Sequence, residues 1–444
     1  MKPNVLIMIA DDATYTDLSL YGGQNVATPH IDALGQEGLV FNRAYLPMAM
    51  CNPCRTALYT GLHPVRNGAC WNHSAARTGT KSIVHYLGDL GYRVGLAGKK
   101  HVVPAESFQF ENVLGIEPSC VHPDPEFGVD GVREFIGRNK EEPFCLVVGF
   151  TEPHSPWTLG DYTHFDQDTL QLPAFIADTP ETREDFARYL AEIEVLDQKV
   201  GEVLGVLNDS GLADDTLVIF TSEQGSQFPG CKWTNWNTGV HTGFIVRWPG
   251  QVTSGRTDAI IQYEDVVPTL VEVAGGDPEP MNLDGMSFLS VIQEGKEDHR
   301  EYSYFVHNNI PEGPPYPIRS VGDGTYHYIR NLMPEAIYIE KHLMGQNKWH
   351  QYWPTWVVDA TFNENTRMLV NRYMHRPAEQ LYHMGDDPFE MTNLADDPAH
   401  AEAKERLSNE LDRWLKEQGD PGAEIDTEEQ WQASKDGRHF ERVV

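Results

Sequence analysis

The sequence predicts an α/β protein, with a large, mostly parallel sheet sandwiched by helices and a smaller C-terminal α+β subdomain that contains an antiparallel sheet. Strand-like apolar runs alternate with helix-like stretches over about the first 290 residues, a pattern typical of βαβ units. After about residue 300 the pattern changes to short, closely spaced strands. A chain of 444 residues also exceeds what one hydrophobic core usually serves. We therefore expect a larger domain over residues 1–300 and a smaller one over residues 301–444.

The elements of the first part follow from their apolar spacing. Val5 to Ile9 is an uninterrupted apolar run, which is typical of a strand buried on both faces. Apolar residues at helical intervals predict the longest helix over Glu181 to Leu207. Further strands are expected at Tyr92–Ala97, Pro143–Phe150, Leu217–Phe220 and Gly243–Val246, and further helices at Ile31–Gly38, Thr80–Leu90 and Val266–Ala274.

The second part combines strands with one long helix. Short strands separated by turn residues are expected at Tyr302–His307, Arg319–Val321 and Tyr326–Arg330. Pro398 to Glu417 has the spacing of an amphipathic helix. The acidic segment after Gly419 is polar, so we expect it to lie along the surface.

Charge and composition exclude several classes of protein. Lys and Arg total 34 against 66 Asp and Glu, a net charge of −32, which argues against nucleic-acid or anionic-membrane partners but leaves room for a local basic pocket. Six cysteines are too few for a disulfide scaffold. The N-terminal apolar run is short, lacks a cleavage site and meets two aspartates, so we interpret it as a strand. We expect a cytoplasmic protein, or a periplasmic or secreted one if a leader was removed.

Two adjacent carboxylates, Asp11 and Asp12, follow the first strand. Ligands of open α/β sheets bind at the carboxyl ends of strands. Neighbouring carboxylates repel each other unless a cation lies between them, and their oxygen atoms suit Ca²⁺ or Mg²⁺. A solvated turn or a helix N-cap explains the pair equally well.

The segment Cys51-Asn52-Pro53-Cys54-Arg55 contains a Cys-x-x-Cys spacing, which on its own indicates a redox pair or half of a zinc site. A zinc site needs a second pair, and the other four cysteines provide none at such spacing. A redox pair needs a small thioredoxin-type setting, and this chain is much larger. Neither interpretation therefore fits well.

The same segment is Cys-x-Pro-x-Arg followed by Leu58-Tyr59-Thr60-Gly61, and it resembles the type I sulfatases of the alkaline phosphatase superfamily. In that family this cysteine is oxidised to formylglycine. Further matching segments occur in family order along nearly the whole chain. They are Gly98-Lys99-Lys100-His101, Glu152-Pro153-His154-Ser155-Pro156, Thr221-Ser222-Glu223-Gln224-Gly225, Lys232, and Leu381 to Leu394. Within the family, Gly98 to Val102 and Phe228-Pro229 look most like heparan N-sulfatase (sulfamidase) and its bacterial relatives.

The resemblance implies an alkaline-phosphatase-like fold, a catalytic domain over residues 1–300, and hydrolysis of sulfate esters or sulfamates on a carbohydrate. It implies a sulfated saccharide as substrate and a formylglycine-generating enzyme as maturation partner, and it leaves the oligomeric state open. Residue 51 would be the nucleophile, Arg55 would hold its hydrate, and His101 would orient or deprotonate it. Lys99 and Lys232 would bind the sulfate, and His154 would protonate the leaving group. The implied ligands of Ca²⁺, or Mg²⁺, are Asp11, Asp12, Cys51, Glu223 and Gln224.

Two features leave alternatives open. The family usually has Asp followed by Asn or His where this chain has Glu223-Gln224, and Cys54 replaces a Ser or Ala. A catalytically impaired binder of sulfated glycans is therefore one alternative, and a phosphonate or phosphodiester hydrolase of the same superfamily is another. For sugar binding we single out Trp71, His73, Trp233 and His307, because aromatic faces and loop side chains contact sugars.

Overall fold

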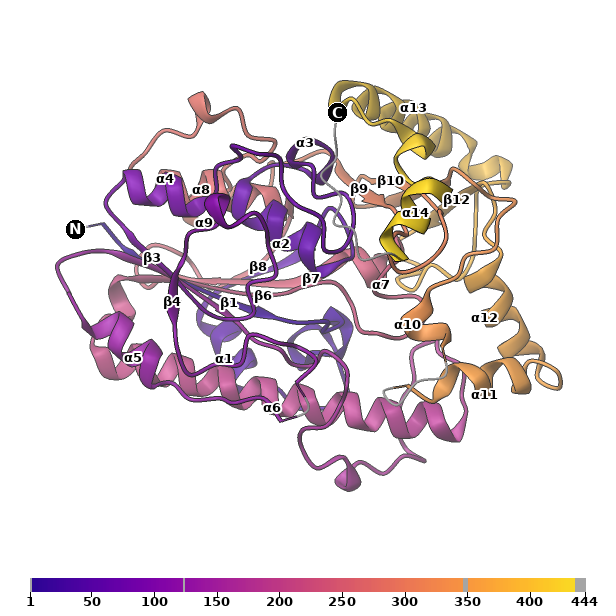
Figure 1. Cartoon of the computed structure of the whole chain (residues 1–444), viewed down its shortest axis with the longest axis horizontal. Coiled ribbons are helices and arrows are strands. Elements are labelled where there is room, and N and C mark those ends of the chain that lie inside the picture. Colours follow the sequence, from indigo (N-terminus) through magenta and orange to yellow (C-terminus); the bar gives the residue numbers. More distant parts are fainter. Residues whose placement is uncertain (1, 123, 346–349, 436–444) are drawn as a thin grey trace.

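The computed structural model describes residues 2–122, 124–345 and 350–435. An eight-stranded sheet forms the centre of the molecule, with strand order β4-β3-β5-β1-β6-β7-β2-β8 and helices on both faces (Figure 1). β7 runs antiparallel to both its neighbours, and the other neighbouring strands pair in parallel. The strands are β1 (Asn4–Ala10), β2 (Leu39–Tyr45), β3 (Arg93–Gly98), β4 (Glu111–Val113), β5 (Phe144–Gly149), β6 (Thr216–Ser222), β7 (His241–Arg247) and β8 (Gly255–Gln262).

The alternation of side chains along β1 explains why helices cover both faces. Val5 and Ile7 belong to one hydrophobic core, and Leu6 and Met8 belong to the core on the opposite face. All seven residues of β1 are buried, as expected for a strand covered on both sides. One face carries α2 (Cys51–Thr60), α4 (Ile83–Asp89), α8 (Val266–Val273) and α9 (Leu289–Glu294), and the other carries α1 (Pro29–Glu37), α5 (Asp130–Gly137) and α6 (Pro180–Ser210) (Figure 1).

The longest helix, α6, has clear sequence signals at both ends. Thr179 caps its N-terminus by accepting a hydrogen bond from the Thr182 amide, and Pro180 occupies the first turn. Gly211 ends the helix in the left-handed conformation with φ 74°. Sixteen of its 31 residues are buried, so α6 owes its stability to packing along the sheet.

A second sheet follows, and its four strands are all antiparallel in the order β12-β11-β10-β9. The amphipathic helix α13 (Ala401–Gln418) packs on β10 and β11 and buries Leu407, Leu411 and Trp414. The ring of Trp414 stacks on Tyr304 with centroids 4.5 Å apart. The other elements here are β9 (Ser303–His307), β10 (Ile318–Gly322), β11 (Tyr326–Asn331), β12 (Glu379–His383), α10 (Lys341–Met344), α11 (Tyr352–Asp359), α12 (Glu364–Met374) and α14 (Glu428–Lys435).

These two sheets confirm the predicted fold class. One hydrophobic core contains residues of the large sheet, of α6 and of the second sheet, so the two parts pack together without a break. The boundary at residue 300 stays a prediction. The sequence did not indicate β2, β4, β8 or β12, nor the short helices α3 (Pro64–Asn67) and α7 (Asn237–Val240), nor α5, α9, α10, α11, α12 and α14.

The expectation that the acidic segment after Gly419 lies along the surface is wrong for its first residues. Asp420 forms a buried ion pair with Arg319, at 2.7 Å between Oδ2 and Nε. The buried carboxylate of Asp426 accepts hydrogen bonds from the amides of Asn309, Ile310 and Tyr316. Burial of an unpaired carboxylate is costly, so these bonds tie the segment to the loop after β9.

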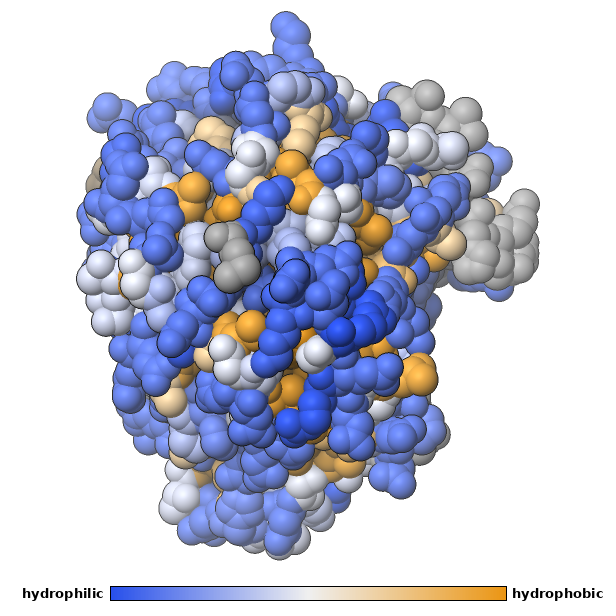
Figure 2. All heavy atoms as spheres, turned by 90° about the vertical axis from the view of Figure 1, so that its left-hand side faces the viewer, coloured by the Kyte–Doolittle hydropathy of each residue, from blue (hydrophilic) through white to orange (hydrophobic). Residues whose placement is uncertain are grey.

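One face of the molecule is largely hydrophilic (Figure 2). Figure 2 shows the face on the left-hand side of Figure 1, where hydrophilic residues predominate and apolar residues form small, separated patches. No helix within the described parts of the chain combines the length and the apolar character that crossing a membrane requires.

Candidate active site

The candidate site lies at the carboxyl ends of the central strands. β1 and β6 pair in parallel with Ala10 opposite Ser222, so the residues that follow each strand emerge side by side. The Glu223 amide donates to the Ala10 carbonyl at 2.9 Å, which brings Asp11 and Glu223 together. Asp12 has a φ of 65°, and this left-handed turn directly after the strand is rare for a residue with a side chain.

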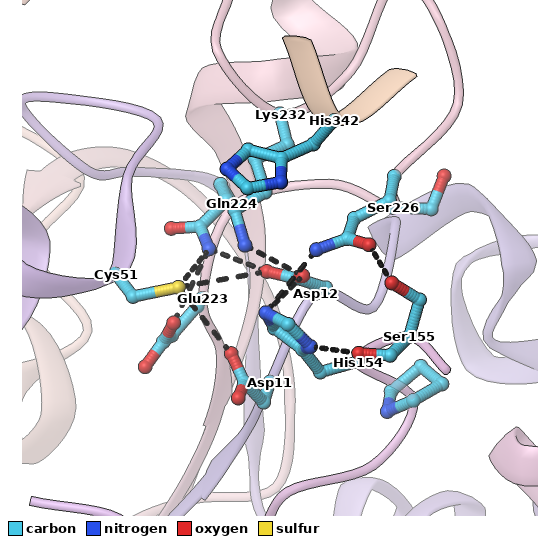
Figure 3. Close-up of polar contacts among 12 residues, drawn as sticks. Asp11, Asp12, Cys51, His154, Ser155, Glu223, Gln224, Ser226, Lys232 and His342 are labelled. Atoms are coloured by element: carbon cyan, nitrogen blue, oxygen red, sulfur yellow. Dashed lines mark hydrogen bonds and ion pairs between the residues drawn. The ribbon is translucent and has the colours of Figure 1, made fainter. Parts of the chain in front are cut away.

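Three carboxylates and one thiol meet at this edge (Figure 3). Ligand atoms of Asp11, Asp12, Cys51 and Glu223 all lie within 4.8 Å of one another, and all four residues are buried. Cys51 is the first residue of α2, and its Sγ lies 3.6 Å from Asp11 Oδ1 and 3.9 Å from Asp12 Oδ1. Burial raises the pKa of the Cys51 thiol well above its usual value, so an unmodified Cys51 is a poor nucleophile here.

Gln224 closes the cluster. Its Nε2 lies 2.5 Å from Asp12 Oδ1, 3.1 Å from Cys51 Sγ and 3.2 Å from Glu223 Oε2, while Cys54 Sγ donates to its Oε1 at 3.5 Å. The two ends of an amide are assigned from their hydrogen bonds, and a half-turn would direct Oε1 at the same atoms. Three carboxylates and an amide oxygen are the donors that Ca²⁺ or Mg²⁺ takes, so these residues could hold such an ion.

Three buried cationic side chains balance the carboxylates. Lys99 Nζ donates to Asp11 Oδ2 at 2.5 Å, and Lys232 Nζ donates to Asp12 Oδ2 at 2.7 Å. Arg55 pairs with Glu223, and its Nη1 donates to the Lys99 carbonyl at 2.6 Å.

The charges in this cluster fix one another's protonation states. Burial raises the pKa of Asp11, but the charges of Lys99, His154 and Arg55 outweigh it and bring that pKa well below the usual range. Burial lowers the pKa of Lys232, but Asp12 outweighs it and raises that pKa above its usual value. The lysines are therefore cationic at any physiological pH.

His154 approaches the cluster from the loop after β5. Its Nε2 lies 3.5 Å from Asp12 Oδ2 and 3.1 Å from Gln227 Nε2, and Ser155 Oγ donates to the same glutamine (Figure 3). Burial lowers the pKa of His154, but the negative charges of Cys120, Asp12 and Asp11 outweigh the effect of burial and raise that pKa to about 9. His154 is therefore placed and protonated like a general acid.

The other sequence-predicted residues lie at different distances from this cluster. His101 is beside it, and its Nε2 lies 2.8 Å from Nδ1 of His73, whose side chain is 54% exposed. Trp233 is buried beneath Lys232, with the ammonium 4.7 Å from the ring centroid. Trp71 packs in a separate cluster with Cys70, Ile310 and Ile425, and His307 is completely buried on β9. The structure does not bring Trp71 or His307 to the carboxylates.

Sequence reasoning missed three residues near the cluster. A sulfur of Cys120, a ring nitrogen of His154 and an oxygen of Asp11 lie within 4.8 Å of one another. Gln227 bridges His154 and His350, at 3.1 Å to each. His342 stacks on Trp233, the indole that Lys232 also contacts. Only Gln227 lay near a recognised motif, so a longer motif window would have found that residue alone.

Comparison with known proteins places these residues in a family. The Sulfatase profile matches residues 3–276, and the profile of the C-terminal part of N-sulphoglucosamine sulphohydrolase matches residues 232–332. An ulvan-active sulfatase of Formosa agariphila is 32% identical over 94% of this chain and 81% of its own length. Human N-sulphoglucosamine sulphohydrolase is 28% identical over 94% of this chain and 91% of its own.

Solved structures share the fold. A protein solved in complex with its substrate D-glucosamine-2-N,6-O-disulfate aligns with a TM-score of 0.72 and 19% identity, over 95% of this chain and 99% of its own. The phosphonate monoester hydrolase of Agrobacterium radiobacter aligns with a TM-score of 0.70 and 19% identity, over 94% of this chain and 96% of its own. The resemblance inferred from the sequence is thus confirmed, and the chain belongs to the sulfatase family of sulfuric ester hydrolases.

Proposed function

We propose that this chain hydrolyses sulfate esters or sulfamates on a carbohydrate, with residue 51 as a formylglycine and with a divalent cation held by Asp11, Asp12, Glu223 and Gln224. One observation carries the proposal: Cys51 begins α2 within 4 Å of two carboxylates whose other oxygen atoms are bound by Lys99 and Lys232. Nucleophile, ligands and anion-binding cations are thereby gathered at one strand edge.

The chain's own cations suit an anionic substrate. Lys99 and Lys232 are buried and permanently charged, and each has a compact ammonium that can also donate to a sulfate oxygen. Preorganised charge in a buried site stabilises the transferring sulfuryl group strongly, because little reorganisation is needed. A hydrated formylglycine would supply the hydroxyl that attacks sulfur, and the cation would supply positive charge beside it.

His154 would provide the proton for the leaving group. A sugar alkoxide or amine is a poor leaving group, so its departure needs a general acid. The raised pKa of His154 favours its protonated form, and Asp12 Oδ2, 3.5 Å from its Nε2, holds that nitrogen toward the cluster. Arg55 binds Glu223 and the Lys99 carbonyl, so its role is to hold the charged cluster together.

The substrate class follows from the relatives. The relatives' names give ulvan and N-sulphoglucosamine as substrates, so we infer that this chain acts on a sulfated saccharide. The assay below distinguishes an N-sulfate from an O-sulfate. A formylglycine-generating enzyme is the partner we infer for maturation. Cys51 and Arg55 are completely buried, so that enzyme must reach the segment before the chain has folded.

The test starts from protein co-expressed with a formylglycine-generating enzyme. Peptide mass spectrometry should show the thiol of residue 51 replaced by an aldehyde, and only converted protein should release sulfate from D-glucosamine N-sulfate or D-glucosamine 6-sulfate. Cys51→Ala protein with an unchanged melting temperature is the control. Full activity in protein that retains the thiol would refute the nucleophile, and faster turnover of an aryl phosphodiester than of every sulfate would favour the phosphodiesterase alternative.

A further inference from the structure

We propose that six side chains around Glu312 form a saccharide-binding subsite beside the candidate active site, and that this subsite makes the enzyme prefer sugar sulfates to aryl sulfates. This inference rests on the proposed function. We call the group the Glu312 rim. It consists of Asn72, His73, Trp233, Glu312, Lys341 and His342.

Glu312 organises the rim. Its side chain is only 1% exposed, yet it stands among polar groups from two other segments. Asn72 Nδ2 donates to Glu312 Oε1 at 2.8 Å, His342 Nε2 lies 2.7 Å from Oε2, and Lys341 Nζ lies 3.3 Å from Oε2. A buried carboxylate is stable only when it is paired, so these contacts both stabilise Glu312 and fix the orientation of its partners.

The partners of Glu312 face outward. The side chains of His342, His73 and Lys341 are 37%, 54% and 54% exposed, in contrast to the buried hub between them. A buried acceptor that holds several partly exposed donors fixes a polar surface in advance, which lowers the entropy cost of ligand binding. The rim is thus a prepared surface for a polar ligand.

The rim joins the candidate catalytic residues on two sides. On one side His73 Nδ1 lies 2.8 Å from His101 Nε2, and His73 Nε2 lies 3.9 Å from Glu312 Oε1. On the other side the His342 ring stacks on Trp233, with centroids 5.6 Å apart and planes at 15°, and Lys232 lies against the same indole. A ligand that contacts the rim therefore lies next to any sulfate held by Lys232.

This chemistry suits the hydroxyl groups of a sugar. Imidazole and ammonium groups donate hydrogen bonds, while buried Trp233 supports His342 from below rather than facing the ligand. A nitrophenyl group has no hydroxyls to match these donors. Binding energy from the rim would accordingly be available to a saccharide and largely unavailable to an aryl sulfate.

A metal ion is the other ligand that the group could take, because atoms of Glu312, Glu340 and His342 lie within 4.8 Å of one another. Hydrogen bonds already account for that arrangement. Glu340 caps α10 by accepting from the amides of His342 and Leu343, at 3.1 Å and 2.7 Å, and Glu312 is bound as described above. The saccharide therefore explains the exposed donors better than a cation does.

The test compares His342→Ala and Glu312→Gln with wild-type protein, all with residue 51 converted and Ca²⁺ present. KM for D-glucosamine 6-sulfate or D-glucosamine N-sulfate, whichever wild type turns over faster, should rise about 10- to 100-fold, as expected for losing one or two hydrogen bonds. For 4-nitrophenyl sulfate, KM and kcat should both stay within about threefold. His164→Ala removes an exposed histidine that is paired with Glu194 outside the rim, so it should leave KM and kcat unchanged for both substrates.

A second measurement avoids turnover. Titration calorimetry should show that the sugar sulfate binds to Cys51→Ala protein. The Kd for Cys51→Ala/His342→Ala protein should be about 10-fold higher or more. Equal losses on sugar and aryl substrates, an unchanged sugar KM, or zinc binding that His342→Ala abolishes while sugar binding persists would each overturn the subsite. Failure of wild-type protein to release sulfate from any substrate would instead overturn the proposed function, and the calorimetry would still test the rim.

Discussion

Removal of the divalent cation should lower the stability of this protein as well as its activity. Three carboxylates balance three cationic side chains at the ends of β1 and β6, and protonated His154 beside them adds one positive charge. A bound Ca²⁺ would add two more positive charges, and a sulfate ester would offset part of that excess. Because linkage is reciprocal, ion and sulfate should each tighten the binding of the other.

The expected size of the effect follows from mass action. An ion present at 100 times its Kd stabilises the folded state by about 2.7 kcal/mol. The unfolding entropy near the melting temperature is about 2.1 cal/mol/K per residue, or roughly 0.9 kcal/mol/K for 444 residues. The ion should therefore raise Tm by about 3 °C, and a sulfate ester added with the ion should raise it further than the two separate shifts combined.

Scanning calorimetry with EDTA, with Ca²⁺ and with Mg²⁺ measures this shift. Asp12→Asn should abolish it, because that change removes a ligand and frees Lys232. Glu192→Gln is the matched control, since Glu192 is a buried carboxyl outside the cluster that accepts from the Thr158 and Leu159 amides. An equal Tm shift by the ion in Asp12→Asn protein, or no shift by either ion in wild-type protein, would contradict this prediction.

Three further predictions concern single residues. His154→Ala should lower kcat/KM for a sugar sulfate about 10²- to 10⁴-fold and kcat/KM for 4-nitrophenyl sulfate far less. Equal losses for the two substrates would remove His154 from the general-acid role. Burial lowers the pKa of His307 to about 3, so the folded state keeps it neutral while the unfolded state takes up a proton below pH 6.5. Between pH 8 and pH 5 wild-type protein should lose roughly 2 kcal/mol more unfolding free energy than His307→Gln, and parallel urea titration curves would contradict this. Iodoacetamide should inactivate converted protein by alkylating Cys120 beside His154, and a Cys120→Ser variant inactivated at the same rate would refute it.

Only the Asp11-Asp12 pair was predicted from its place at a strand end, and the resemblance to sulfatases supplied Lys99, Lys232 and Glu223. Three of these residues directly follow strands. Asp11 follows β1, Lys99 follows β3 and Glu223 follows β6, and parallel pairing brings these ends to one edge. The Glu312 rim has no such local signal. Asn72 and Glu312 are 240 positions apart, and only the packing of the second sheet against the first brings them together.

Burial also separates the two histidines proposed for sugar binding. His307 ends β9, a position that indicates an exposed strand end. However, the neighbouring Val306 amide donates to the Pro47 carbonyl at 2.9 Å, so β9 docks against the larger sheet and His307 becomes core. His73 follows the short helix α3 with a φ of 65°, and this turn presents its ring on the surface beside His101. Spacing along the sequence could not distinguish these outcomes, because contacts between segments that are distant in the sequence decide them.

The three residues that depart from the usual sulfatase pattern contact one another or the same partners. Gln224 extends one methylene further than Asn, and its amide lies between Cys54 and Asp12. A thiol is a weak donor and a weak acceptor, so Cys54 can face either end of that amide, and the oxygen can turn toward a cation at little cost. Glu223, also longer by one methylene, reaches Arg55 as well as the carboxylate cluster. The three changes therefore act as one coupled adjustment that keeps the donors converged, and it is this convergence that argues against a homologue that binds sulfated glycans without hydrolysing them.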